Sequence, residues 1–303
     1  MTDNPGDKPI DDGPSALEQV SSWLSSLGVK IEKNRLSTYS RAFRTIDVHI
    51  KAGTLEKIRN ELSPNEAANA FHEFGEIFHV WRGLKSLDDP ILSQKLAKVV
   101  TGPPMLSQER PETSEPRNTL FELVIAAHLS LCGIKIVFRD PDDIVARVLH
   151  TPLLIECKRI QSTARFKDQF HKARRQLVRN LANETSPRSK GLIAIDISKT
   201  QNPGASVFKT ESAAKVRGML IRKANQFCWQ RMDLFREQID EAILGVIVYL
   251  RIPWVTGSEV MSALNSQFVQ LIPLNQNADR NKKIFAALVS YLTRLDPNMT
   301  RLI

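Results

Sequence analysis

Residues 134 to 160 restrict the fold of this chain most, because three short apolar segments follow one another with only a few turn residues between them. The segments are "IKIVFRD" (134–140), "IVARVL" (144–149) and "LLIECKRI" (153–160), joined by "PDD" and "HTP". Apolar runs of this length, bounded by Pro and Asp, indicate β-strands. Strands joined by such short turns must be antiparallel neighbours. We therefore expect a three-stranded meander.

The segments on either side of this meander alternate between helical and strand patterns. A helix is expected at 119–133, where Gly133 suits the C-terminal cap. After the meander, the pattern predicts a basic helix and then a strand, followed by further helices and strands. This mixture predicts an α/β (α+β) fold with a central mixed sheet flanked by helices. The later elements are expected at 163–183 (helix), 191–198 (strand), 212–238 (helix), 242–250 (strand), 268–274 (strand) and 281–295 (helix).

The first third of the chain has a different pattern and predicts an all-helical N-terminal domain. Residues 1–14 are acidic and rich in Pro and Gly, which predicts a disordered tail. Residues 15–100 are helical in pattern, and "SPNEAANAFHEFGEIFHVWRGL" begins with a capping box formed by Ser63 and Glu66. Residues 101–118 contain four prolines and predict a linker or long loop. The remaining domain is then 119–303.

Composition narrows the setting of the protein. The net charge of +9 favours a polyanionic partner such as nucleic acid. No apolar run is long enough for a membrane span, and the N-terminus lacks the features of a signal peptide. Three scattered cysteines indicate buried thiols in a reducing compartment, so we expect a cytoplasmic protein. Two histidines of the N-terminal helices, His72 and His79, have no further ligands nearby, which favours a structural role.

The positions of the charged residues within "LLIECKRI" indicate a candidate catalytic site. Side chains alternate along a strand, so Glu156 and Lys158 should share one face. If His150 and Thr151 form the turn, Asp143 lies across from Lys158 on that same face. A slip of one residue would move it to the other face, and Asp142 or Asp140 would be alternative carboxylates.

Two carboxylates and a lysine on one sheet face suit phosphodiester hydrolysis. Carboxylate oxygens bind hard divalent cations such as Mg²⁺. A bound cation activates water and neutralises phosphoryl charge, and a neighbouring lysine orients that water.

This arrangement resembles the PD-(D/E)xK, or restriction-endonuclease-like, nuclease superfamily. The resemblance rests on Asp143, which lies thirteen positions before Glu156, and on the sequence "ECK" of Glu156 to Lys158. The proline of the pattern is also present, as Pro141, one position earlier than usual. The order of elements from 119 to 200 is also similar. By resemblance, Asp143, Glu156 and the Cys157 carbonyl would ligate Mg²⁺ or Mn²⁺, and Lys158 would position the attacking water. The resemblance also assigns Glu122 as a further ligand and Gln176 as the glutamine that some members carry on the following helix.

Positive charge is concentrated beside this candidate site. Between Lys158 and Lys190 there are ten basic residues and two acidic ones, a net of +8 in a chain whose total is +9. Basic residues of this kind contact phosphates without reading sequence. The candidate nucleic-acid contacts are Arg159, Arg165, Lys167, Lys172, Arg174, Arg175 and Arg179.

The resemblance implies a metal-dependent endonuclease, with DNA favoured over RNA, in a setting such as restriction, repair or anti-phage defence. The N-terminal helices would then serve oligomerisation or a partner protein. The alternative is a catalytically silent nucleic-acid-binding or assembly module on the same fold. The chain has no Walker loop, nucleophile elbow or dinucleotide fingerprint, which argues against an unrelated α/β enzyme.

Structural roles are the alternative for each residue. Glu156 and Lys158 would then be a solvated face of an edge strand, Asp143 a turn residue, and Glu122 a glutamate favoured by the helix dipole. The basic helix would be a solvated face, His150 a turn residue and His128 a packing residue.

Overall fold

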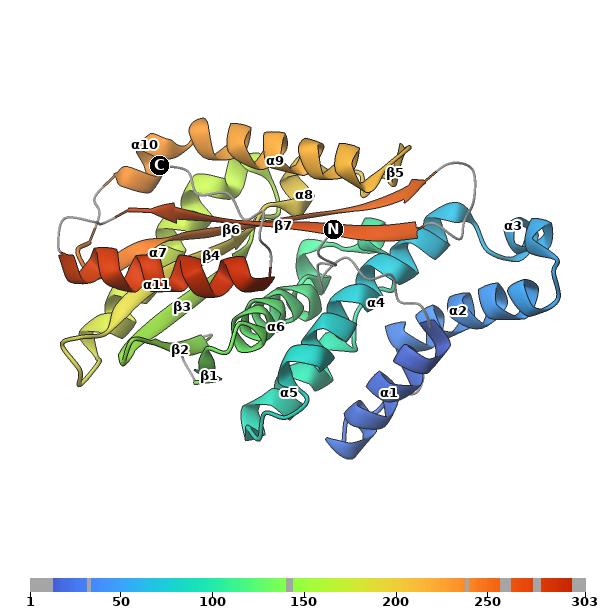
Figure 1. Cartoon of the computed structure of the whole chain (residues 1–303), viewed down its shortest axis with the longest axis horizontal. Helices are drawn as coiled ribbons and strands as arrows, with labels where there is room; N and C mark the ends of the chain where they lie inside the picture. Colours follow the sequence, from blue (N-terminus) through green and yellow to red (C-terminus); the bar gives the residue numbers. More distant parts are fainter. Residues whose placement is uncertain are drawn as a thin grey trace.

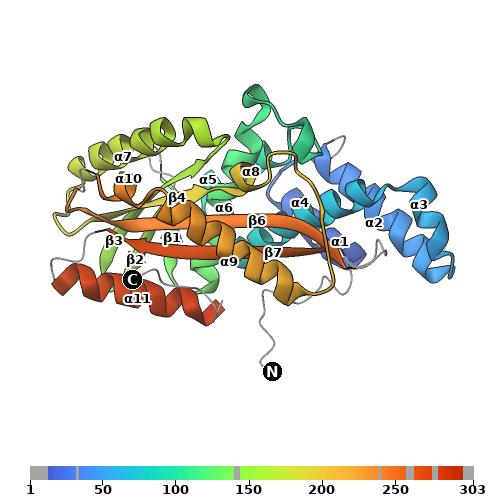
Figure 2. The same cartoon turned by 90° about the horizontal axis from the view of Figure 1, so that it is seen from above.

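The computed structural model describes residues 13–31, 34–139, 144–237, 240–256, 263–274 and 279–295. At the centre of this described part is a seven-stranded sheet, which lies between two layers of helices (Figures 1 and 2). Three strands, β3, β4 and β6, are parallel neighbours, and antiparallel pairs lie on either side of them. The expected mixed sheet flanked by helices is therefore confirmed.

The sheet follows the order β1-β2-β3-β4-β6, with two more strands beside β6. Strands β4 and β5 pair with different stretches of one edge of β6, and β7 pairs with its other edge. The sequence did not predict β5, which has only three residues. The strands are β1 (Lys135–Val137), β2 (Ile144–Val148), β3 (Thr151–Arg159), β4 (Lys190–Asp196), β5 (Phe208–Thr210), β6 (Ile243–Thr256) and β7 (Ala263–Pro273).

Helices cover both faces of the sheet. On one face lie α4 (Pro64–Leu84), α6 (Glu115–Leu131) and α11 (Asp279–Leu295), and on the other lie α7 (Phe166–Ala182) and α9 (Ala213–Trp229) (Figure 1). The expected helix at 212–238 is interrupted, because α9 ends at Trp229 and α10 begins at Met232. The remaining α-helices are α1 (Gly13–Ser26), α2 (Arg35–Lys51), α3 (Ile58–Glu61), α5 (Pro90–Val99), α8 (Ser198–Gln201) and α10 (Met232–Arg236).

The N-terminal region is helical, as the sequence predicted, and its longest helix begins at the predicted cap. The side chain of Ser63 accepts from the backbone N–H of Glu66 at 3.1 Å, and the Glu66 carboxylate accepts from the N–H of Ser63 at 3.0 Å. These two bonds satisfy amides that have no partner within the helix. The first helix already starts at Gly13, so the expected tail is shorter than 1–14, and residues 1–12 lie outside the described residues.

Helix α6 is fixed in place at its end and along its side. After the helix, Gly133 adopts a φ of 81°, and the N–H of Ile134 bonds back to the Leu129 carbonyl at 3.0 Å, which together form the predicted glycine cap. A Cβ built on Gly83 of α4 would lie 2.6 Å from the carbonyl oxygen of Ala127. Only glycine at that position allows α4 and α6 to approach so closely.

The segment 101–118 was predicted as a linker or long loop, and the structure shows that it is packed against its neighbours. It contains two short 3₁₀ helices, η2 (Leu106–Gln108) and η3 (Pro111–Thr113), before α6 begins at Glu115. The Tyr39 hydroxyl donates to the carbonyl of Pro104 at 3.0 Å, and Arg117 donates to that of Pro103 at 3.0 Å. One hydrophobic cluster extends from α1 through α6 to α11.

The hairpin of β2 and β3 has a different register from the one predicted. Its turn residues are Leu149 and His150, with φ values of 48° and 62°, and Val148 pairs with Thr151. The prediction of His150 and Thr151 as the turn is therefore wrong. A turn of type I′ needs two left-handed residues, which a β-branched threonine disfavours. Every partner on β2 lies two residues earlier than predicted, so the facing of side chains is unchanged.

Strand β3 is covered on both faces. Leu153, Ile155 and Cys157 pack in the core beneath α4 and α6, whereas Leu154 packs in the second core beneath α7 and α9. Side chains alternate along a strand, so Glu156 and Lys158 belong to the α7 face. Because β3 is an interior strand of the sheet, the alternative of a solvated edge strand does not apply.

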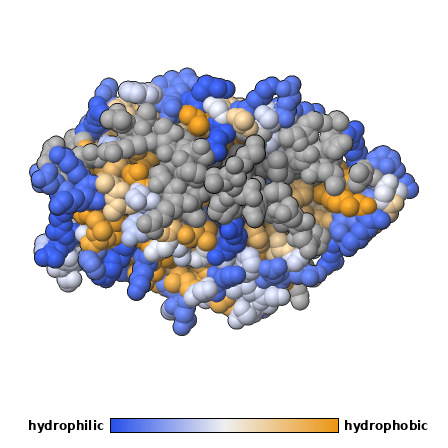
Figure 3. Space-filling model, in the orientation of Figure 1, coloured by the Kyte–Doolittle hydropathy of each residue, from blue (hydrophilic) through white to orange (hydrophobic). Residues whose placement is uncertain are grey.

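The molecular surface is mixed in character. Figure 3 shows hydrophilic residues along much of the rim of one face, with small apolar groups between them. None of the helices in the described ranges combines the length and hydrophobicity of a membrane-spanning segment. Among the residues whose burial is described, the exposed large hydrophobic side chains are Val48, Ile50, Val137, Leu149 and Trp229.

Candidate functional site

The two charges of "LLIECKRI" form an ion pair on the α7 face of β3. The Lys158 ammonium donates to the Glu156 carboxylate, and both residues come from one strand. The Glu156 side chain is 1% exposed, whereas that of Lys158 is 25% exposed. Burying a carboxylate is costly unless it is paired, and Lys158 supplies that partner. The pair therefore combines a buried carboxylate with a partly exposed lysine.

Glu122 lies on α6, which packs on the opposite face of the sheet. Its carboxylate binds the ammonium of Lys95 on α5 at 2.5 Å, and both side chains are mostly buried. The Lys95 ammonium also lies over the ring of Phe138, 5.6 Å from its centroid. Phe138 directly follows β1, so Glu122 is held near the end of that strand.

The third predicted carboxylate, Asp143, lies outside the described residues, as do Asp140, Pro141 and Asp142. In the chain, Asp143 directly precedes Ile144, whose partner on β3 is Ile155, the neighbour of Glu156. Among the described residues, no group of three or more His, Cys, Asp or Glu residues is arranged to hold a metal ion.

The donor chemistry near Glu156 suits a hard cation. The Glu156 carboxylate and the Cys157 carbonyl are the oxygen ligands that Mg²⁺ and Mn²⁺ prefer, whereas the Cys157 thiol is buried in the core. These two donors are too few on their own, so a metal site would need carboxylates from the segment 140–143. The described donors therefore fit the metal in kind and are incomplete in number.

Helix α7 carries two glutamines on the side that meets the sheet. Gln176 is half-buried, and Gln169 lies two turns before it on the same helix face. The Oε1 atom of Gln169 is buried and has no hydrogen-bond partner among the described residues. The sequence analysis did not select Gln169. Its spacing of seven residues from Gln176 was the signal that could have found it.

The basic residues around α7 divide into exposed and engaged groups. Arg174 is half-buried and donates to the carbonyl of Glu237 at 2.7 Å. Arg159 is buried, and its guanidinium donates to Asp196 at 3.0 Å and to Glu109 at 2.6 Å. Arg159 is therefore not part of a nucleic-acid surface, contrary to the prediction. The exposed residues are Arg165, Lys167, Lys172, Arg175 and Arg179.

A second group of charges, which the sequence analysis missed, lies beneath the N-terminal helices. Glu73 of α4 is buried and binds Arg35 at 3.0 Å and Arg117 at 3.1 Å. Burial alone would raise the pKa of Glu73, but Arg117 and Arg35 together lower it to about 2. We call the whole group the buried charge cluster, which consists of Arg35, Glu73, Glu76, Glu109, Arg117, Arg159, Asp196, Lys199 and Arg251.

The buried charge cluster joins the helices to the carboxyl ends of β3 and β4 and to Arg251 within β6. Glu76 of α4 lies 2.6 Å from Arg251 of β6 and accepts from the Tyr249 hydroxyl at 3.1 Å. Glu109, in the segment before α6, binds Arg159 of β3 and also Lys199 at 3.4 Å. A cavity of about 20 Å³ lies among these groups. It has room for about one water molecule, so it cannot receive a substrate.

Comparison of the chain with protein-family models, with curated proteins and with solved structures finds no match.

Proposed function

We propose that the protein is a metal-dependent nuclease whose reacting groups gather around Glu156 and Lys158. The observation that carries this proposal is the Glu156–Lys158 pair, a buried carboxylate joined to a partly exposed lysine on one face of an interior strand. This ion pair joins two residues of the same strand. A buried carboxylate next to a partly exposed lysine is a combination typical of functional sites.

The residues would divide the work as follows. Glu156 and the Cys157 carbonyl would hold the cation, together with Asp143. Lys158 would donate a hydrogen bond to the attacking water and stabilise the charge that develops on the phosphoryl oxygens. A divalent cation supplies charge neutralisation and the activation of water. Gln169 or Gln176, on the helix that covers the same face of the sheet, would orient the water. The resemblance also assigns Glu122, but this residue lies on α6 across the sheet, so its carboxylate would have to reach the cation around the edge of the sheet, near the end of β1.

The outer surface of α7 would hold the nucleic acid. Its exposed basic residues follow directly after β3, so a bound phosphate backbone would pass close to Lys158. No described motif reads bases, and we therefore propose phosphate-directed binding, with DNA as the favoured substrate.

Cleavage assays test this proposal. Plasmid DNA, single-stranded DNA and RNA would each be incubated with Mg²⁺ or Mn²⁺. We expect Lys158→Ala and Glu156→Gln to lower the rate at least about 100-fold. Lys190→Ala is the matched control, because Lys190 is a half-buried lysine on the neighbouring strand that donates to the carbonyl of Glu241. Equal activity of Lys158→Ala and Lys190→Ala would remove the catalytic assignment.

A silent binding module on the same fold is the second candidate. The observation that favours it is that both described carboxylates, Glu156 and Glu122, are paired with lysines. It predicts that the wild-type protein binds nucleic acid, that neither metal supports cleavage, and that Lys172→Glu and Arg175→Glu weaken binding. Cleavage that depends on Lys158 would exclude it.

A further inference from the structure

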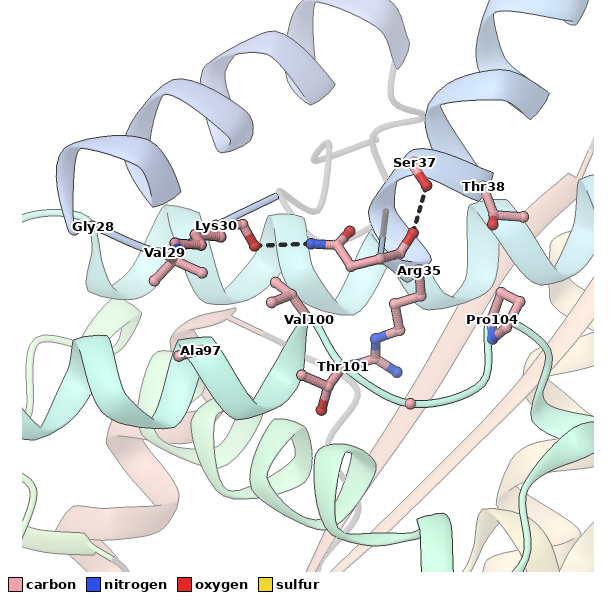
Figure 4. A pocket seen from close by; sticks show the side chains of 12 residues that line it. Gly28, Val29, Lys30, Arg35, Ser37, Thr38, Ala97, Val100, Thr101 and Pro104 are labelled. Carbon is pink, nitrogen blue, oxygen red and sulfur yellow. Dashed lines mark hydrogen bonds between the residues drawn. The ribbon is translucent and has the colours of Figure 1, made fainter. Parts of the chain in front are cut away.

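A cleft of about 780 Å³ lies among the N-terminal helices, and its lining residues precede β1 in the sequence. Its walls come from the segment that follows α1, the start of α2, the last turns of α5 and the segment after α5 (Figure 4). This volume is typical of sites for small organic ligands. The residues with polar side chains that line it are Lys30, Asn34, Arg35, Ser37, Thr38 and Thr101.

The described lining of the cleft carries positive charge and no carboxylate. Lys30 is exposed at its rim. The first turn of α2, a helix of 17 residues, faces the cleft through Asn34, Ser37 and Thr38. A helix N-terminus carries about half a unit of positive charge and favours anions.

Arg35 provides an independent indication that the ligand is an anion. Its side chain is 0% exposed, yet the residue lines the cleft, and Figure 4 shows the guanidinium extending from α2 toward the segment of Thr101 and Pro104. Among the described residues, the Nη1 atom alone has an acceptor, the Glu73 carboxylate at 3.0 Å. The Nε and Nη2 atoms are buried and have no hydrogen-bond partner among the described residues. Buried donors of this kind call for an acceptor, because leaving them unsatisfied costs about 1–3 kcal/mol each.

The charges around Arg35 are also unbalanced. Glu73 is shared by Arg35 and Arg117, so these three side chains carry a net charge of +1. The Nη1 atom of Arg117 likewise has no partner among the described residues. The buried charge cluster as a whole contains five cations and four carboxylates. The excess positive charge of Arg35, Glu73 and Arg117 lies next to the cleft, which Arg35 lines, and burial there strengthens the attraction for an anion.

We propose that this cleft binds a phosphate monoester of nucleotide size. The excess charge of the cluster, Lys30 and the start of α2 together match a group that carries nearly two negative charges at neutral pH. Lys30 and the first turn of α2 contact the phosphate from the rim, and Arg35 forms the charged floor. The remaining volume accommodates the nucleoside. This proposal does not depend on the proposed nuclease activity, because none of its residues belongs to that site.

Calorimetric titration of the full chain tests the proposal, with AMP, adenosine and inorganic phosphate as probes. We expect saturable binding of AMP, weaker binding of phosphate and no binding of adenosine. Lys30→Glu, an exposed substitution that leaves the core untouched, should weaken AMP binding about tenfold. Thr101→Glu, which adds a carboxylate to the cleft, should weaken it similarly. Lys57→Glu, an exposed lysine outside the cleft, is the matched control and should bind like the wild type.

Three results would overturn the proposal. These are a failure of AMP to saturate at millimolar concentration, an equal loss in Lys30→Glu and Lys57→Glu, and binding of adenosine as tight as that of AMP. A further pair of probes separates two sources of the phosphate. If a 5′-phosphorylated oligonucleotide binds more tightly than AMP and its 5′-hydroxyl counterpart does not bind in the cleft, the ligand is a nucleic-acid end. If AMP binds more tightly, it is a free nucleotide.

Discussion

Charged side chains enter the interior of this protein on both faces of the sheet, and the two groups differ in what they connect. In the buried charge cluster, every ion pair joins residues at least 37 positions apart, such as Arg159 with Asp196 and Arg35 with Glu73. On the α7 face, Glu156 and Lys158 are two positions apart on one strand. The first group therefore holds separate elements together, whereas the Glu156–Lys158 ion pair lies within one strand.

This difference separates scaffold from candidate chemistry. Both groups are costly to desolvate, so burial alone does not distinguish them. The cluster compensates by tying α2, α4 and α6 to the ends of β3 and β4 and to Arg251 within β6. The Glu156–Lys158 ion pair lies within β3, and its lysine remains partly accessible. We therefore take a buried carboxylate that is paired within its own strand as the better indicator of function.

The largest effect that the comparison predicts concerns Glu73. Glu73→Gln leaves the guanidinium groups of Arg35 and Arg117 without their shared counter-charge, and we expect a loss of about 3–5 kcal/mol of unfolding free energy. Urea denaturation measures this loss. The control is Glu115→Gln, whose partner is Lys98 and whose side chain is 69% exposed, and we expect a change of less than about 1 kcal/mol. Equal losses of unfolding free energy in Glu73→Gln and Glu115→Gln would show that the buried charge cluster does not hold the helices and strands together.

A pH dependence extends the comparison to the contact between α4 and α6. The rings of His79 and His128 lie 5.8 Å apart, and burial, followed by the nearby His128, lowers the pKa of His79 to about 3. The folded state therefore keeps His79 neutral where the unfolded state binds a proton, so stability is full above about pH 6.5 and falls toward pH 3.

Binding of one proton by the unfolded state changes the unfolding free energy by about 1.4 kcal/mol per pH unit. We therefore expect the unfolding free energy to decrease by about 2 kcal/mol between pH 6 and pH 4.5. Urea denaturation at a series of pH values checks this. His79→Gln should remove most of the decrease, and His150→Gln, in the exposed hairpin turn, should keep it. A wild-type stability that is flat across this window would contradict the assignment.

Local patterns predicted much of the fold, because they depend on residues close in sequence. The cap at Ser63, the glycine cap at Gly133 and the alternation along β3 were all correct, since each involves a few neighbouring residues. The hairpin register was wrong because it depended on which two of three residues adopt left-handed angles. The segment 101–118 was predicted as a loop from its prolines, and its packing depends on partners such as Tyr39 that are far away.

The buried charge cluster was beyond sequence analysis for the same reason. Glu109 and Arg159 are 50 positions apart, and neither has a local pattern that marks it as buried. Arg159 was read as a phosphate contact only because basic residues surround it. The Glu156–Lys158 pair was predictable because a strand places residues two apart on one face. The role of Asp143 stays a prediction.

A substitution of Lys95 tests whether Glu122, on the α6 face of the sheet, serves the metal site proposed around Glu156, and we expect an effect of intermediate size. Its ammonium lies 2.5 Å from the Glu122 carboxylate and so competes with any cation that this carboxylate would serve. If the proposed metal site includes Glu122, Lys95→Met should tighten Mn²⁺ binding about tenfold. Titration calorimetry measures this, with Lys98→Met as control. In a Glu122→Gln background the gain should vanish. Unchanged affinity in Lys95→Met, with binding that still requires Glu156, would remove Glu122 from the site and leave Glu156 in it.

The smallest expected effect is the stability change in Glu156→Gln, and it decides the comparison. Glu156 is as buried as Glu73, so a rule based on burial alone predicts a similar loss. However, the Lys158 side chain is 25% exposed and can turn its ammonium to water when its partner is neutral. We therefore expect a change within about 1 kcal/mol in urea denaturation, compared with several for Glu73→Gln. A loss of about 3 kcal/mol or more, as expected when a buried ion pair is broken, would show that Glu156 stabilises the fold. The distinction between the buried charge cluster and the Glu156–Lys158 pair would then fail.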